Sequence, residues 1–141
     1  MDGQANVSQI MTRNVVSVFE EDNLHKVAQN LEHFRFRHLP VVDGTRLVGI
    51  LSQRDLLRNA VGGPERSPAL KALEGRLLEQ TFVRDVMRVE VSTIAPEDSI
   101  AEAARRMLEL KVGALPVVTA RGELVGIVSQ DDILRHVATP V

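Results

Sequence analysis

The chain has 141 residues, 44% hydrophobic and 26% charged, which is enough for one compact domain or two small joined halves of a globular protein. Four Phe, no Trp or Tyr and a net charge of −2 argue against nucleic-acid binding, which uses exposed aromatic side chains or a basic excess. No cysteine is present, and no apolar run reaches the ~18 residues of a membrane span. The N-terminal residues lack the basic and apolar regions of a signal peptide. We therefore expect a cytoplasmic protein that contacts neither nucleic acid nor membrane.

The first half of the chain carries a series of short elements after an apolar lead-in at residues 7–11. β-Branched runs indicate strands, apolar residues at helical spacing indicate helices, and Asp43-Gly44 is a turn signal. The pattern predicts, in order, a strand, a helix, two strands and a second helix: residues 15–18, 22–34, 39–42, 47–51 and 52–60.

The middle of the chain, residues 63–80, has no counterpart in either half. It opens with the breakers Gly63-Pro64 and Ser67-Pro68, and then places leucines at helical spacing between Leu70 and Leu78. We interpret it as a linker with an amphipathic helix at about 69–80, whose role the sequence does not define.

The second half repeats the order of the first, with strands at 91–94, 115–118 and 124–128 and a last helix at 129–137. Its first helix begins at Ser99, where Ser-X-X-Glu forms a capping-box sequence, and ends near residue 113. The helix is expected to bury five apolar residues: Ile100, Ala103, Ala104, Met107 and Leu108.

An internal repeat relates the two halves. A shift of 76 residues places Leu39-Pro40-Val41-Val42 on Leu115-Pro116-Val117-Val118, and a shift of 77 aligns the strand–helix segments that follow. Each half alone cannot bury both faces of its apolar strands, so two halves around one core are the economical solution. We predict an α+β fold of two pseudo-symmetric β-α-β-β-α repeats packed sheet to sheet, with boundaries 1–62, 63–80 and 81–141.

A serine stands at both strand-to-helix junctions, Ser52 and Ser129, followed three residues later by Asp55 and Asp132. Serine suits an N-cap, and the positive end of a helix with its unpaired N–H groups can attract an anion. The same Ser-X-X-Asp spacing also resembles a capping box that serves stability alone. Both interpretations remain open at this point.

The order of elements, the Leu-Pro-Val-Val strand and the paired Gly-Ile-(Leu/Val)-Ser-Gln-X-Asp segments resemble a tandem CBS-domain pair, also called a Bateman module. The resemblance covers about residues 7–60 and 82–138. It implies a stand-alone regulatory module that binds an adenosine-containing ligand in clefts between the repeats.

The resemblance also implies which residues contact the ligand. The family motif places Ser52 and Asp55, and Ser129 and Asp132, on phosphate and ribose, where an ionised carboxylate can accept hydrogen bonds from both ribose hydroxyls. The adenine is expected between apolar residues and main-chain groups of both repeats: Val16, Ser17, Ile50, Ser92, Thr93 and Ile127.

Cations at family positions predict where phosphates bind. Arg37, His38 and Arg54 occupy such positions in the first repeat, whereas Gly113-Ala114 and Asp131 replace them in the second. We expect two unequal sites, with the Asp55 side more tolerant of anions. The alternative is that these arginines are solvated surface charges.

The sequence has no nucleophile–base signature and no phosphate loop or dinucleotide fingerprint, and its histidines lack metal-ligand spacing. We therefore assign no catalytic residue, metal or cofactor. The predicted ligand is AMP, ADP or ATP, with S-adenosylmethionine or NAD as alternatives. The resemblance further implies a homodimer, with the helices at Ser52 and Ser129 as contacts, and an unidentified regulated protein. The alternative function is a structural, dimerisation or partner-binding module with vestigial clefts.

Overall fold

The computed structural model describes residues 5–27, 38–52 and 79–139. The chain divides into two compact units. We call them the C-terminal unit, which combines residues up to Val15 with Thr45–Leu47 and Ser92–Val141, and the central unit, which holds Val16–Gly44 and Val48–Val91.

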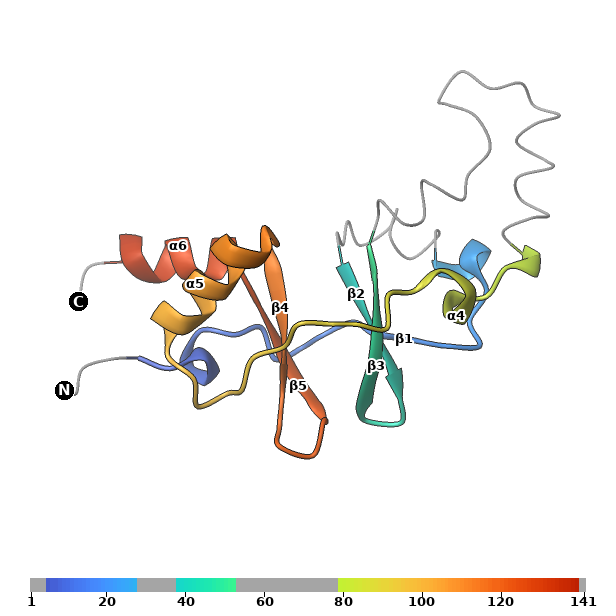
Figure 1. The fold of residues 1–141 in the computed structure, drawn as a ribbon, viewed down its shortest axis with the longest axis horizontal. Helices are drawn as coiled ribbons and strands as arrows, with labels where there is room; N and C mark the ends of the chain where they lie inside the picture. The colour runs from blue at the N-terminus through green and yellow to red at the C-terminus, as the bar shows by residue number, and fades with distance from the viewer. Residues whose placement is uncertain (1–4, 28–37, 53–78, 140–141) are drawn as a thin grey trace, which may run out of the picture. The chain divides into compact units, whose positions relative to one another are not determined.

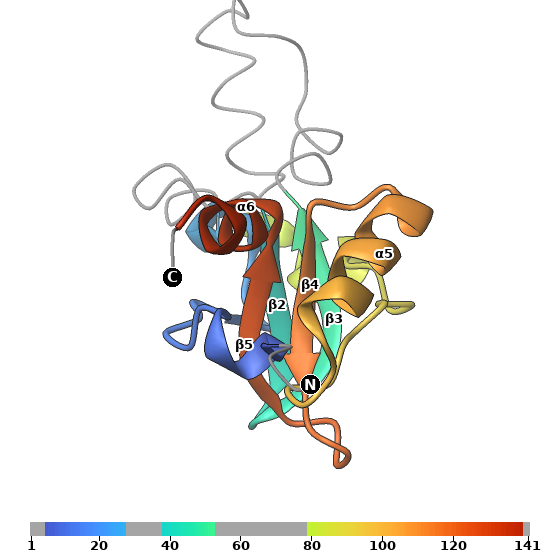
Figure 2. The same ribbon diagram turned by 90° about the vertical axis from the view of Figure 1, so that its left-hand side faces the viewer.

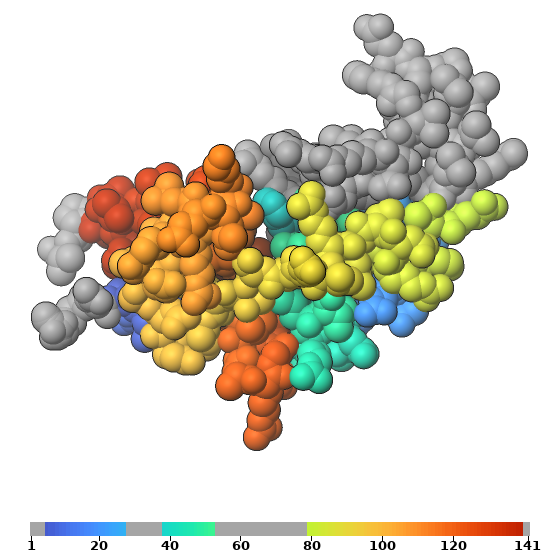
Figure 3. Space-filling model, viewed as in Figure 1, coloured from blue at the N-terminus to red at the C-terminus, as the bar shows by residue number. Residues whose placement is uncertain are grey.

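The C-terminal unit is built on an antiparallel pair of strands, β4 (Ala114–Val118) and β5 (Leu124–Ser129). Helices α5 (Ile100–Leu110) and α6 (Gln130–Ala138) lie on one face of this pair (Figures 1 and 2). The turn that joins the strands projects from the unit (Figure 3). A short 3₁₀ turn, η1 (Val7–Gln9), completes the unit. Its core consists of fully or almost fully buried apolar side chains: Val7, Met11, Ile94, Ala103, Met107, Leu115, Val117 and Val128.

The central unit contains a three-stranded sheet in the order β1-β2-β3 and the short helix α4 (Val83–Val86). Strand β1 (Val18–Phe19) pairs in parallel with β2 (His38–Asp43), and a turn at Gly44 leads into β3 (Arg46–Ser52). Gly44 has φ +64°, a left-handed conformation that glycine adopts without steric cost. The core of the unit is again apolar and buried: Val18, Leu24, Val27, Leu39, Val41, Leu51 and Val83.

Most of the predicted elements that fall on described residues are confirmed. The four longer strands, β2 to β5, and both helices of the second repeat lie where the pattern places them. The first predicted helix begins with residues 24–27, and the remainder of it lies outside the described residues. The helix predicted from Ser52 and most of the linker helix also lie outside them.

The strands predicted at 15–18 and 91–94 are wrong in extent. β1 begins only at Val18, and the second segment makes a single parallel bridge, between Ile94 and Val117. Ile94 N donates to Pro116 O, and Val118 N donates to Ile94 O. The next bond of a parallel ladder would run from the N–H of residue 116 to Ser92 O, but proline has no N–H. The ladder therefore stops there, and Pro40 stands at the equivalent position beside β1.

The buried face of α5 is narrower than predicted. Ile100, Ala103 and Met107 are buried, whereas Ala104 is half-buried and Leu108 is 78% exposed. Leu108 follows Met107 by one residue, about 100° around the helix, and so points away from the core stripe. The helix also ends at Leu110, before Gly113.

Each unit takes its lead-in segment from the other sequence repeat. Thr12 pairs with Ile127 in the C-terminal unit, and Arg88 pairs with Ile50 in the central unit. The units group residues by contact, whereas the boundaries at 62 and 80 describe the sequence repeats. Those boundaries therefore stay a prediction.

Candidate functional site

In the central unit, the described candidate residues lie at one end of the sheet. His38 is the first residue of β2 and Ser52 is the last residue of β3, so both lie at the end opposite the Gly44 turn. Val16 and Ser17 immediately precede β1, which runs parallel to β2, and therefore lie at the same end. All four residues are half-buried.

Ile50 can offer a ligand its side chain rather than its main chain. Its N–H donates to Arg88 O at 3.0 Å, and its carbonyl accepts from Arg88 N at 2.9 Å. Three further candidates of the first repeat, Arg37, Arg54 and Asp55, lie outside the described residues. Their predicted contacts with phosphate and ribose remain predictions.

The C-terminal unit gathers its candidates in the same way. Ser129 ends β5 opposite Ala114, the first residue of β4. The bridge between Ile94 and Val117 is parallel, so Ser92 and Thr93 lie toward the Ala114 end of β4. The register thus places the entry segment and the start of α6 at one end of the sheet, with β4 between them.

Ile127 repeats the arrangement of Ile50. Its N–H donates to Thr12 O at 3.0 Å, and its carbonyl accepts from Thr12 N at 2.8 Å. Its half-buried side chain is the part that remains for a ligand.

Ser129 and Asp132 form a reciprocal capping box at the start of α6. Asp132 N donates to Ser129 Oγ at 3.2 Å, and Ser129 N donates to Asp132 Oδ2 at 2.9 Å. The other carboxylate oxygen, Oδ1, lies 3.7 Å from the exposed guanidinium of Arg135. The two hydrogen bonds show that Asp132 caps α6. Its side chain is 8% exposed, and its contact with a ribose stays a prediction.

The start of α6 is a poorer anion seat than the sequence predicts. Gln130 N donates to Gly113 O, and Asp132 N donates to Ser129, so two of the first three helical N–H groups already have protein acceptors. The exposed carboxylate of Asp131 adds negative charge at the same turn. That the second-repeat side tolerates phosphates less well than the first stays a prediction, because the first-repeat cations Arg37 and Arg54 lie outside the described residues.

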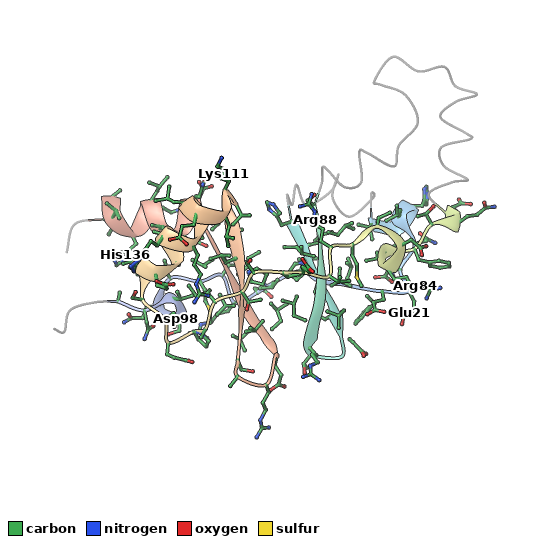
Figure 4. The ribbon with its side chains drawn as sticks, viewed as in Figure 1. Glu21, Arg84, Arg88, Asp98, Lys111 and His136 are labelled. Atoms are coloured by element: carbon green, nitrogen blue, oxygen red, sulfur yellow. The ribbon has the colours of Figure 1, made fainter. Side chains whose placement is uncertain are left out.

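Sequence reasoning missed Arg106, which reaches from α5 to the main chain of a candidate residue. Its Nη1 donates to Thr93 O at 2.5 Å, and its Nε donates to Glu102 Oε2 at 3.0 Å. Asp98, which precedes α5 (Figure 4), accepts a 3.0 Å hydrogen bond from Ala95 N and lies 4.0 Å from Arg106 Nη2. The spacing of four residues between Glu102 and Arg106 was the available signal, but it indicates only a helical ion pair.

The described residues contain no group of three or more His, Cys, Asp or Glu side chains arranged to hold a metal ion. Within the same residues, no helix is long and apolar enough to cross a membrane.

A model of the CBS domain matches the chain twice, over residues 7–62 and 83–139. The two matches cover most of the chain, which therefore belongs to the CBS-domain family and carries a tandem CBS pair. Among curated proteins, the chain is similar to inosine-5'-monophosphate dehydrogenase of Korarchaeum cryptofilum, with 31% identity over 128 residues. That alignment covers 91% of this chain and 23% of the dehydrogenase. The chain thus spans about a quarter of this relative, and it covers 47% of the uncharacterized protein MJ1225 of Methanocaldococcus jannaschii.

Solved structures of CBS proteins share the fold. The crystal structure of MJ1225 has a TM-score of 0.82 and 28% identity, and the match covers 98% of this chain and 49% of that chain. CBSX2 in complex with AMP has a TM-score of 0.78 and 28% identity, and covers 94% of this chain and 95% of that chain. The cytosolic domain of the Mg²⁺ channel MgtE in complex with ATP has a TM-score of 0.71 and 30% identity. That match covers 93% of this chain and 48% of the MgtE chain. The predicted α+β CBS module is confirmed.

Proposed function

We propose that the chain is a non-enzymatic regulatory module that binds an adenine nucleotide of the AMP, ADP or ATP type in clefts between its CBS repeats and signals to a partner protein. The observation that carries the proposal is the likeness to CBSX2, which was crystallised with AMP and matches over nearly the whole length of both chains. The ATP complex of the MgtE domain supports the same class of ligand.

The C-terminal unit has groups suited to a nucleoside. The side chain of Ile127 is apolar and half-buried, as the face of a purine requires. Asp132 Oδ2 is engaged by Ser129 N, so Oδ1 is the oxygen that would accept from ribose hydroxyls, in competition with Arg135. The exposed carboxylate of Asp131 at the same turn would oppose the phosphates of a bound nucleotide.

A second candidate function is a structural or partner-binding module with vestigial clefts. The capping box favours it, because Ser129 and Asp132 have a sufficient reason to be present without any ligand. Exposed apolar side chains on the helices of the C-terminal unit favour it too, since they suit contact with a protein: Leu108, Leu134 and Val137.

Calorimetric titration with AMP, ADP, ATP, S-adenosylmethionine and NAD separates the two functions. The informative variants are Asp55→Asn and Asp132→Asn, because asparagine loses the carboxylate charge. At position 132 it also retains an oxygen that can accept from Ser129 N, which preserves the cap. Asp131→Asn is the matched control, since Asp131 lies in the same helical turn and does not close the cap.

We expect saturable binding of at least one adenine nucleotide, and a loss of about tenfold or more in affinity in one of the two Asp variants. The variant that loses affinity identifies the occupied cleft, while Asp131→Asn binds at least as tightly as the wild type. If none of the five compounds binds a protein that unfolds cooperatively, the structural module replaces the sensor.

A further inference from the structure

The segment that enters the second-repeat sheet, residues 91–93, is not held by the sheet. Its pairing with β4 ends at Ile94, because Pro116 has no N–H to donate to Ser92 O. No donor meets the carbonyl of Ser92 within the part of the chain that the structure describes. Something other than a strand ladder must fix the position of this segment.

Arg106 provides that attachment. Its guanidinium donates to Thr93 O, and it is held in turn by the carboxylate of Glu102, four residues earlier on α5. Asp98 extends the network, because its Oδ2 accepts from Ala95 N and lies near Arg106 Nη2. A charge-assisted hydrogen bond with a second ion-pair partner is stronger and better directed than one between neutral groups.

The sequence of the first repeat carries different residues at these two positions. At the positions equivalent to Arg106 and Glu102 under the 76-residue shift stand Asn30 and Lys26. Lys26 instead pairs with Asp22, at 3.5 Å. The Glu-X-X-X-Arg pair that attaches the entry segment to α5 therefore has no counterpart at the equivalent positions of the first-repeat sequence.

We propose that Arg106 is a positioning residue of the second-repeat nucleotide site, which fixes the Ser92–Thr93 main chain so that it can read the edge of the adenine. The inference rests on the proposed function, because it assigns Arg106 a role toward the same ligand. With its main chain fixed by Arg106, the segment presents the Ser92 carbonyl as an acceptor for the 6-amino group. A 6-oxo purine has no such donor, so the arrangement selects adenine over hypoxanthine.

The test compares AMP with IMP, which carries a 6-oxo group, by calorimetric titration of the full chain. The variants are Arg106→Ala and the milder Arg106→Gln. Glutamine keeps an N–H donor without the charge, and this variant can be measured if the alanine variant folds poorly. The matched control is Arg105→Ala. Arg105 contacts the same Glu102 at 3.2 Å, but it is 59% exposed, and among the described residues the hydrogen bond to Thr93 O comes from Arg106.

We expect the ratio of AMP to IMP affinity to fall by about tenfold in Arg106→Ala, and less in Arg106→Gln, while Arg105→Ala leaves it unchanged. A purely structural role would lower the unfolding temperature but leave this ratio unchanged in both variants, and that result overturns the inference. If the wild type binds AMP but both variants match Arg105→Ala, the inference fails and the proposed function stands. If the wild type binds neither nucleotide, the proposed function itself fails.

Discussion

Lys111 is the residue that caps the C-terminal end of α5, and its backbone conformation costs free energy. It is a non-glycine residue with positive φ, at φ 57° and ψ 44°, and its N–H donates to Met107 O. Helices commonly end with a left-handed residue, usually glycine, because the Cβ of other residues meets the following carbonyl. The exposed side chain projects from the end of the helix (Figure 4), so little packing offsets the strain.

We predict that Lys111→Gly raises the free energy of unfolding by about 0.5–1 kcal/mol, because glycine adopts the left-handed conformation without the Cβ penalty. Urea denaturation followed by circular dichroism measures the change. Lys111→Val is the opposing variant, and it should destabilise, because β-branching worsens the same conformation. Equal stability of the glycine and valine variants would show that the backbone at position 111 is not strained.

The candidate site shows what a sequence pattern can and cannot decide at single residues. The sequence correctly predicted that Ser129 caps α6, because a serine between an apolar strand and a helix has few other uses. It could not decide whether Asp132 caps or binds, since one carboxylate oxygen can accept from Ser129 N while the other remains for a ligand. Arg106 was not predicted, because it binds the main-chain carbonyl of Thr93, 13 residues away. Every residue has a main-chain carbonyl, so the identity of the residue at position 93 does not indicate the contact.

Among the elements, the segment that precedes each repeat packs in the unit built from the other repeat: Thr12 pairs with Ile127, and Arg88 pairs with Ile50. A glycine beside each of these pairs allows the two segments to approach closely. A Cβ on Gly126 would lie 2.6 Å from Met11 Sδ and 3.0 Å from Thr12 O. In the central unit, a Cβ on Gly49 would lie 2.8 Å from Met87 Sδ and 2.9 Å from Arg88 O. The glycines in the two copies of Leu-Val-Gly-Ile are therefore required by close approach of another segment.

We predict that Gly126→Ala destabilises the protein by about 1–3 kcal/mol, the usual cost of overpacking a core contact. Chemical denaturation measures the change. Met11→Ala should itself destabilise, because Met11 is a core residue. In a double-mutant cycle the cost of Gly126→Ala should be smaller in the Met11→Ala background but should not vanish, because the clash with the backbone carbonyl of Thr12 persists.

Gly113→Ala is the matched control for this prediction. A Cβ there would meet its nearest atoms at 3.9 Å, an ordinary contact distance, so the substitution should change stability little. Equal effects of alanine at positions 113 and 126 would contradict the close-approach argument.

The sequence predicted well those elements whose bounds are set by residues within or next to the element itself. Apolar strands beside a turn signal, and helices with a serine cap, carry that information locally. The entry strands were predicted too long, because the limit on them comes from Pro40 and Pro116 on the neighbouring strands. That effect can be seen only once the strand register is known.

For the whole molecule, we propose a homodimer formed through the exposed face of the helix that follows Ser129 and through the helix predicted to follow Ser52, which lies outside the described residues. The helix that follows Ser129 is α6, on which Leu134 is 64% and Val137 74% exposed. Two large apolar side chains in solvent on one short helix are more easily explained by a protein contact than by the fold of the unit itself.

We predict that Leu134→Glu shifts the chain from dimer to monomer, because the new carboxylate would be buried without a partner in the interface. Sedimentation equilibrium measures the mass directly. Leu108→Glu, at an even more exposed position on α5, should leave the dimer intact. A wild-type monomer, or equal dissociation by both variants, would contradict the assignment of the contact to α6.

Thermal unfolding of the full chain in the presence of AMP tests whether this CBS pair binds an adenine nucleotide. Ligand at 100 times its dissociation constant adds about 2.7 kcal/mol of stability. For a domain of this size, that corresponds to a rise of several degrees in Tm. We predict such a rise with AMP and none with ribose 5-phosphate, which lacks the base. A cooperative transition at the same temperature with and without saturating AMP, ADP or ATP would show that the protein does not bind these nucleotides.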